Sequence, residues 1–154
     1  MNFYDYLNHQ CGEEKRAFIM HFPARSGKTR FAQKVCETRS DAFRLDLLAY
    51  FHHQADLPPI QQCGFEQLRQ ILLGLDVSKA EILVDNGDFL FNTWNQEEKD
   101  AFLNWLRRGL RSPANTDKTF VFILQSDDWF TTQTLGENVH GEDRILAMSQ
   151  FEAL

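Results

Sequence analysis

An apolar run at residues 16–22, followed after a short loop by Gly27-Lys28-Thr29, most strongly constrains the fold of this chain. The run predicts a strand that is buried on both faces of a sheet. Gly27-Lys28-Thr29 is the second half of the phosphate-binding loop pattern G-x-x-x-x-G-K-[ST], which is meaningful only between a strand and a helix. Apolar side chains recur along one side of residues 28–38, so these residues are expected to form that helix.

The residue types of the loop suit phosphate binding. Small Ser26 and Gly27 allow backbone N–H groups to curl inward around an anion, and the N-terminal end of the next helix directs its positive dipole to the same point. In such a loop Lys28 contacts the β- and γ-phosphates, and the Thr29 hydroxyl ligates Mg²⁺. The predicted nucleotide-binding residues are Pro23, Ala24, Arg25, Ser26, Gly27, Lys28, Thr29 and Arg30.

The loop departs from the full pattern at its first position, where Phe22 replaces a glycine. That first glycine serves turn geometry, whereas the second, Gly27, lies where the backbone approaches phosphate. Pro23 also stiffens the turn. Phe22 therefore argues against a fully regular loop and tight binding. The alternative to a nucleotide site is a strand, a turn and a helix with an incidental lysine.

A second apolar run, residues 80–84, ends in Asp85. An apolar strand with a terminal aspartate is the Walker B pattern, and such a strand shares a parallel sheet with the strand before the phosphate-binding loop. Because ligands of open α/β sheets bind at the carboxyl ends of strands, Asp85 is expected near a Mg²⁺ ion on Thr29. The alternative is that Asp85 forms a turn or caps a helix.

Strands and helices alternate along the rest of the chain. This alternation predicts one α/β domain over residues 1–154, a three-layer α/β/α sandwich with a mainly parallel sheet. The remaining predicted elements are strands at 42–48, 80–85, 118–126 and 144–148, helices at 64–75 and 94–111, a short helix within 1–15, and loops at 50–59 and 131–142.

Charge and composition exclude two classes of partner. A formal net charge of −6 argues against nucleic-acid binding by the whole surface. No apolar run approaches the roughly 20 residues that a membrane span needs. The N-terminus lacks a basic segment followed by an apolar one, and the three cysteines contain no C-x-x-C pair, so a cytoplasmic protein with reduced thiols is expected.

A local basic cluster, Arg107, Arg108 and Arg111, lies at the end of the helix predicted at 94–111. Arginines at this position interact favourably with the negative C-terminal end of a helix dipole. The alternatives are an arginine finger that acts on another molecule's nucleotide and a contact to a DNA phosphate backbone. Because the whole chain is acidic, DNA contact through the cluster is expected to be weak or indirect.

The loop at 23–29 and the run at 82–85 resemble the additional-strand branch of P-loop NTPases, the group that contains the AAA+ ATPases. The resemblance implies ATP and Mg²⁺ as cofactors and an extra strand between the P-loop and Walker B strands. It also implies a glutamate directly after the Walker B aspartate, but Asn86 stands there and cannot act as a base. The helical lid domain of many AAA+ proteins is not evident. The catalytic residues that the resemblance implies are Lys28, Asp85, the nearby acid Asp88, and Gln125 as a γ-phosphate sensor.

A polar residue at a strand end is common without any such role, so an incidental Gln125 stays an alternative. In length and layout the chain also resembles the BrxF family, small P-loop proteins of type 3 BREX (bacteriophage exclusion) systems. The resemblance implies a bacterial antiphage component that acts with a larger ATPase, a DNA methyltransferase and other operon partners, and self-association is compatible with it.

Three functions compete on this basis. The leading one is an ATP-binding regulatory or assembly subunit whose hydrolysis is weak or depends on a partner that supplies an arginine. The second is a small-molecule kinase, for which Asp46 is the acid placed to hold an acceptor. The arginine-rich lid of a kinase is poorly supported, since only Arg144 follows the last loop. The third is a nucleotide-free scaffold with a degenerate loop.

Overall fold

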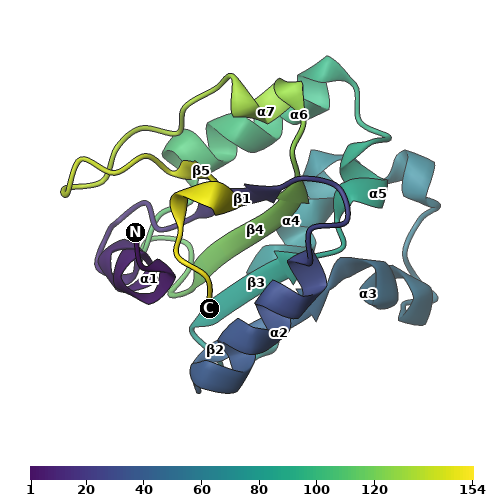
Figure 1. The fold of residues 1–154 in the computed structure, drawn as a ribbon. Helices are drawn as coiled ribbons and strands as arrows, with labels where there is room; N and C mark the ends of the chain where they lie inside the picture. Colours follow the sequence, from purple (N-terminus) through teal and green to yellow (C-terminus); the bar gives the residue numbers. More distant parts are fainter.

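Five short strands form one sheet in the computed structural model, which describes residues 1–154 (Figure 1). All neighbouring strands are parallel, and their order across the sheet is β2-β3-β4-β1-β5. β4 therefore lies between β1 and β3, which confirms the expected inserted strand. The strands are β1 (Phe18–Phe22), β2 (Ala42–Asp46), β3 (Glu81–Asp85), β4 (Thr119–Gln125) and β5 (Ile145–Ala147).

Seven α-helices and three other helical turns connect and cover the strands. The helix predicted at 94–111 is confirmed except at its ends, because a π-helical turn continues α6. The helices are α1 (Phe3–Cys11), α2 (Lys28–Thr38), α3 (Leu47–His53), α4 (Phe65–Leu73), α5 (Asp88–Phe91), α6 (Gln96–Asn104) and α7 (Asp128–Thr131), with turns η1 (Ile60–Gln62), η2 (Trp105–Gly109) and η3 (Met148–Gln150).

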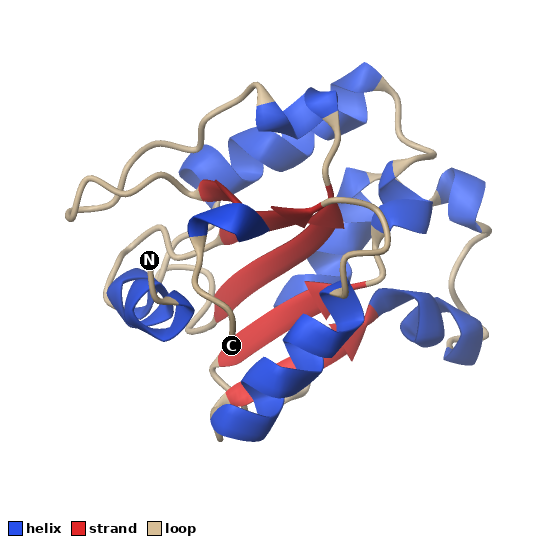
Figure 2. Cartoon of the chain, viewed as in Figure 1, coloured by secondary structure: helices blue, strands red, loops and turns tan.

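Helices lie on both faces of the sheet (Figure 2), as predicted for an α/β sandwich. Successive side chains of a strand point to opposite faces. Met20 and Phe22 of β1 enter a core that α1 and α2 cover. Ile19 enters a larger core that α4, α6 and η2 cover. Because each strand contributes to both cores, β3 and β4 consist of near-continuous apolar residues.

The segment after β2 differs from the prediction. The strand predicted at 42–48 ends at Asp46, and a helix occupies Leu47–His53, where a strand end and a loop were expected. The Asp46 side chain accepts a hydrogen bond from the Ala49 N–H at 3.1 Å, which caps the new helix. The alternation that suggested a longer strand was misleading, because Leu47 is buried as the first residue of α3.

Two four-residue helices follow β3 and β4 directly, and neither was predicted. α5 begins at Asp88, three residues after the end of β3, and α7 begins at Asp128, three residues after the end of β4. Both helices therefore start at the carboxyl edge of the sheet, the edge from which the loop before α2 also departs (Figure 1). No helix in the structure has the length and apolar character needed to cross a membrane.

Candidate functional site

The loop between β1 and α2 (residues 23–27, the β1–α2 loop) has the backbone that its sequence suggested. Gly27 caps α2 with a φ of 88°, in the left-handed region that favours glycine. A Cβ at Gly27 would meet no atom within 4 Å, so backbone conformation rather than space requires glycine there. Arg25 also has a positive φ of 59°. The Ser26 hydroxyl donates to the Pro23 carbonyl at 2.5 Å and closes the loop.

The structure brings together most of the predicted site residues at the N-terminal end of α2. The Thr29 hydroxyl donates to Asp85 Oδ2 at 3.1 Å. Lys28 Nζ lies 3.5 Å from Asp88 Oδ2, and both side chains are mostly buried. Gln125 contributes through its backbone, because its N–H donates to Asp88 Oδ1 at 3.0 Å. The Gln125 side chain itself is exposed at the end of β4.

Sequence reasoning missed one member of the site, Arg44. Its Nε donates to Asp85 Oδ2 at 2.8 Å, and its Nη2 lies 3.5 Å from Asp46 Oδ2. Asp46 and Asp85 are register partners at the ends of β2 and β3, so the Arg44 guanidinium contacts two adjacent carboxylates. A signal was present, since an arginine inside a strand that is otherwise expected to be buried requires an acidic partner.

Asp46 has a structural role, and its carboxylate is not free to hold an acceptor. Burial raises its pKa, but hydrogen bonds from the Ala49 N–H and the Asn86 side chain, together with the charge of Arg44, outweigh burial and lower it. Asp46 therefore stays ionised and holds both the start of α3 and Arg44. Arg144 is also unavailable to a substrate, because it is buried and donates only to backbone carbonyls.

Thr29 and Asp85 lie side by side, as predicted for a magnesium site, but the Arg44 guanidinium already faces the Asp85 carboxylate. Asp85 has no exposed surface, and both of its oxygens already accept hydrogen bonds. The Asn86 N–H donates to Asp85 Oδ1 at 2.8 Å, while Thr29 and Arg44 donate to Asp85 Oδ2. No group of three or more His, Cys, Asp or Glu residues in the chain is arranged to hold a metal.

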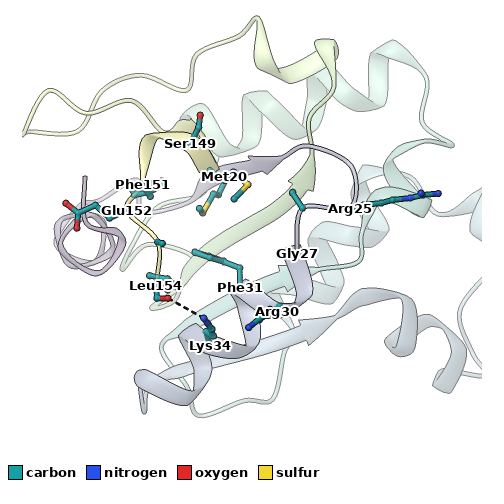
Figure 3. A pocket seen from close by; sticks show the side chains of 13 residues that line it. Met20, Arg25, Gly27, Arg30, Phe31, Lys34, Ser149, Phe151, Glu152 and Leu154 are labelled. Atoms are coloured by element: carbon teal, nitrogen blue, oxygen red, sulfur yellow. Dashed lines mark hydrogen bonds between the residues drawn. The ribbon is translucent and has the colours of Figure 1, made fainter.

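A cavity of about 560 Å³ adjoins the β1–α2 loop (Figure 3). Its size falls within the range of small-molecule sites. The side chains of Met20 and Phe31 give it an apolar floor, and Arg30 and Lys34 of α2 add positive charge. The C-terminal segment, residues 148–154, forms the opposite wall, where Lys34 Nζ donates to the Leu154 carbonyl at 3.3 Å. The sequence predicted Arg30 as a nucleotide-binding residue but gave no sign that residues 148–154 border the same cavity.

The remaining predicted loop residues are solvent-facing. Pro23 and Ala24 are exposed, and Pro23 contributes only the carbonyl that Ser26 binds. Arg25 borders the cavity, but its side chain points away from it (Figure 3). Of the eight predicted nucleotide-binding residues, those from Ser26 to Arg30 therefore carry the geometry of the site.

The basic cluster after α6 is built into the helix end. Arg111 Nε donates to the Arg108 carbonyl at 2.8 Å, which is the interaction expected at a helix C-terminus. Arg107 donates to the Thr134 carbonyl at 2.9 Å. Arg111 also pairs with Glu14, which precedes β1 and so lies at the amino edge of the sheet, opposite the β1–α2 loop. These arginines cannot reach a phosphate bound at the loop of their own chain.

No protein-family model and no curated protein sequence matches this chain. The chemistry of the site is therefore inferred from its charges and its shape. Two mostly buried cations, Lys28 and Arg44, face the carboxylates Asp46, Asp85 and Asp88 at the carboxyl edge of the sheet, beside a helix N-terminus and a cavity.

Proposed function

We propose that this chain binds ATP at the β1–α2 loop and acts as a regulatory or assembly subunit rather than as an independent ATPase. The observation that carries the proposal is the position of Lys28 and Thr29 at the N-terminal end of α2, in contact with Asp88 and Asp85. Backbone N–H groups and the helix dipole at this end favour phosphate. Lys28 would exchange its 3.5 Å contact with Asp88 for a contact to the phosphates.

The cavity beside the loop supports a nucleoside rather than inorganic phosphate as part of the ligand. It begins at Ser26 and Gly27, so a chain of phosphates at the loop can lead directly into it. Phe31 and Phe151 supply the apolar surface that a purine base needs, and Arg30 and Lys34 complement negative charge near the phosphates. A ligand with phosphates at one end and an aromatic ring at the other fits both halves of the site.

Two features support weak hydrolysis without a partner. Asn86, the residue after Asp85, carries no group that can accept a proton from water. Asp88, the nearest alternative base, is engaged by Lys28 and by the Gln125 N–H. The kinase alternative is disfavoured, because Asp46 caps α3 and pairs with Arg44, and Arg144 is buried.

The biological setting rests on the resemblance to the BrxF family alone. We propose on that basis a cytoplasmic role in a bacterial antiphage system, with a larger ATPase and a DNA methyltransferase as partners. Affinity purification of the tagged chain from cells that express the neighbouring genes tests this setting. Recovery of neither partner, with and without ATP, would contradict it and would leave the ATP proposal intact.

Equilibrium titration with a fluorescent ATP analogue tests the nucleotide proposal. Lys28→Ala should weaken binding about 10- to 100-fold, the loss expected for about 1.5–3 kcal/mol of charged hydrogen bonds. Lys15→Ala is the matched control, because the Lys15 side chain makes no hydrogen bond or ion pair, and it should bind like the wild type. Wild-type protein that binds no ATP, or equal affinity of Lys28→Ala and wild type, would refute the proposal.

A further inference from the structure

We infer that Arg44 takes the place of a metal ion at Asp85, so that this site binds its nucleotide without Mg²⁺. The identity of the nucleotide rests on the proposed function. The identity of the cation rests on the contacts of Asp85. It reverses the sequence-based expectation that Thr29 and Asp85 hold Mg²⁺ together. The cation that balances Asp85 is supplied by the chain itself.

The charge of Asp85 is balanced within the protein. Its side chain has no exposed surface, and an ionised carboxylate in such a place needs a cation or several hydrogen bonds. It has both: the Asn86 and Thr29 donors, and the Arg44 guanidinium at 2.8 Å. The carboxylate is therefore balanced before any ligand arrives.

The space around the Asp85 carboxylate is already occupied by hydrogen-bond donors. Mg²⁺ requires near-octahedral oxygen ligands at about 2.0–2.1 Å and usually keeps several waters. Here a hydroxyl and a guanidinium both direct protons at Asp85 Oδ2, and a third donor occupies Oδ1. A divalent ion, or its water, would have to enter next to the positive charge of Arg44. Metal binding at Asp85 thus requires that Arg44 leave.

Contacts with two carboxylates hold Arg44 in place. Its guanidinium bridges Asp85 and Asp46, and it comes from β2, the strand that pairs with β3 in parallel register. Hydrogen bonds also hold Asp46, through its cap of α3. Arg44 is therefore a fixed positioning residue of the site, about four-fifths buried, rather than a mobile surface arginine.

The experiment has one arm with nucleotide and one without. In the first, ATP affinity is measured in excess Mg²⁺ and in excess EDTA. Wild type should show affinities within about threefold of each other, whereas Arg44→Ala, which frees Asp85, should lose about tenfold or more in EDTA. The control Arg69→Ala, whose side chain pairs only with Glu66 on α4, should behave as the wild type.

In the second arm, the melting temperature of nucleotide-free protein is measured with Mg²⁺ and with EDTA. Wild type should show no difference, and Arg44→Ala should be stabilised by Mg²⁺, because the ion replaces the lost cation. Should Arg44→Ala fail to fold, the wild-type comparisons still decide the question.

The outcomes separate the two proposals. Wild-type ATP binding that weakens tenfold or more in EDTA, or a wild-type melting temperature that Mg²⁺ raises, overturns the Arg44 inference and leaves ATP binding standing. Absence of ATP binding in both buffers refutes the proposed function. In that case the nucleotide-free arm alone tests whether Arg44 excludes the metal from Asp85.

Discussion

At the scale of single residues, the position after Asp85 combines a chemical and a conformational feature. Asn86 has no group that can act as a base, and its backbone lies in the left-handed region with a φ of 56°. Asparagine tolerates this conformation better than most residues with a side chain, and glycine adopts it freely. The backbone therefore disfavours the glutamate that the resemblance to hydrolysing ATPases would place here.

We predict that Asn86→Glu lowers the free energy of unfolding by about 1 kcal/mol, the approximate cost of left-handed backbone for an ordinary side chain. Asn86→Gly removes the same side chain without that cost, so it should be clearly more stable than Asn86→Glu. Urea unfolding followed by circular dichroism measures both variants. Equal midpoints for the glutamate and glycine variants would show that the backbone at this position imposes no such preference.

At the scale of secondary-structure elements, one buried arginine ties several segments together. Arg144 precedes β5 and is only 2% exposed. Its guanidinium donates to the carbonyls of Ala17, before β1, and Leu106, in η2, at 3.0–3.1 Å. It also donates to the Leu135 carbonyl at 2.8 Å, and so anchors the long loop between α7 and β5.

Arg144→Met should lower the free energy of unfolding by about 3 kcal/mol or more, because it leaves several buried carbonyls without a donor. Arg144→Lys retains a charge but fewer donors, so its stability should lie between those of the methionine variant and the wild type. Denaturant unfolding provides the comparison. A methionine variant as stable as the wild type would mean that water reaches these carbonyls.

At the scale of the whole molecule, the pKa shifts of His21, Asp46 and Glu142 all change stability in the same direction with pH. Burial lowers the pKa of His21. For Glu142, burial raises the pKa, but hydrogen bonds from Asn138 and His9 outweigh burial and lower it, as also happens at Asp46. Each of these groups binds fewer protons in the folded chain than in the unfolded chain, so stability rises with pH.

We therefore predict a decline in stability on acidification that occurs in two stages. The His21 contribution is lost as pH falls from about 6.5 toward its lower folded pKa, and the Asp46 and Glu142 contributions are lost as pH falls below about 4 through theirs. Unfolding free energies measured across this range should show both stages. His21→Asn keeps a hydrogen-bonding group for Ser126, which lies 2.8 Å from His21, and should reduce the first stage only. An unchanged first stage in this variant would assign it to other histidines.

The local sequence by itself determined the central strands of this protein, its longer helices and the position of its candidate site. Near-continuous apolar runs marked β1, β3 and β4, because strands of a parallel sheet are buried on both faces. Gly27 and Asp85 marked the ends at which the loop and the site would form, and the structure places Thr29 against Asp85 accordingly. These features depend on neighbours within a few residues, which the order of side chains reveals directly.

Only the tertiary structure decided which distant residues complete the site. The contact of Arg44 with Asp85 joins residues 41 apart, and the wall of the cavity joins Lys34 to Leu154, 120 residues away. No local pattern contains these contacts, because they follow from the order of strands in the sheet and from the return of the C-terminus beside α2 (Figure 3). The sequence thus indicated a phosphate site with a metal, and packing placed the Arg44 guanidinium against the carboxylate expected to bind that metal.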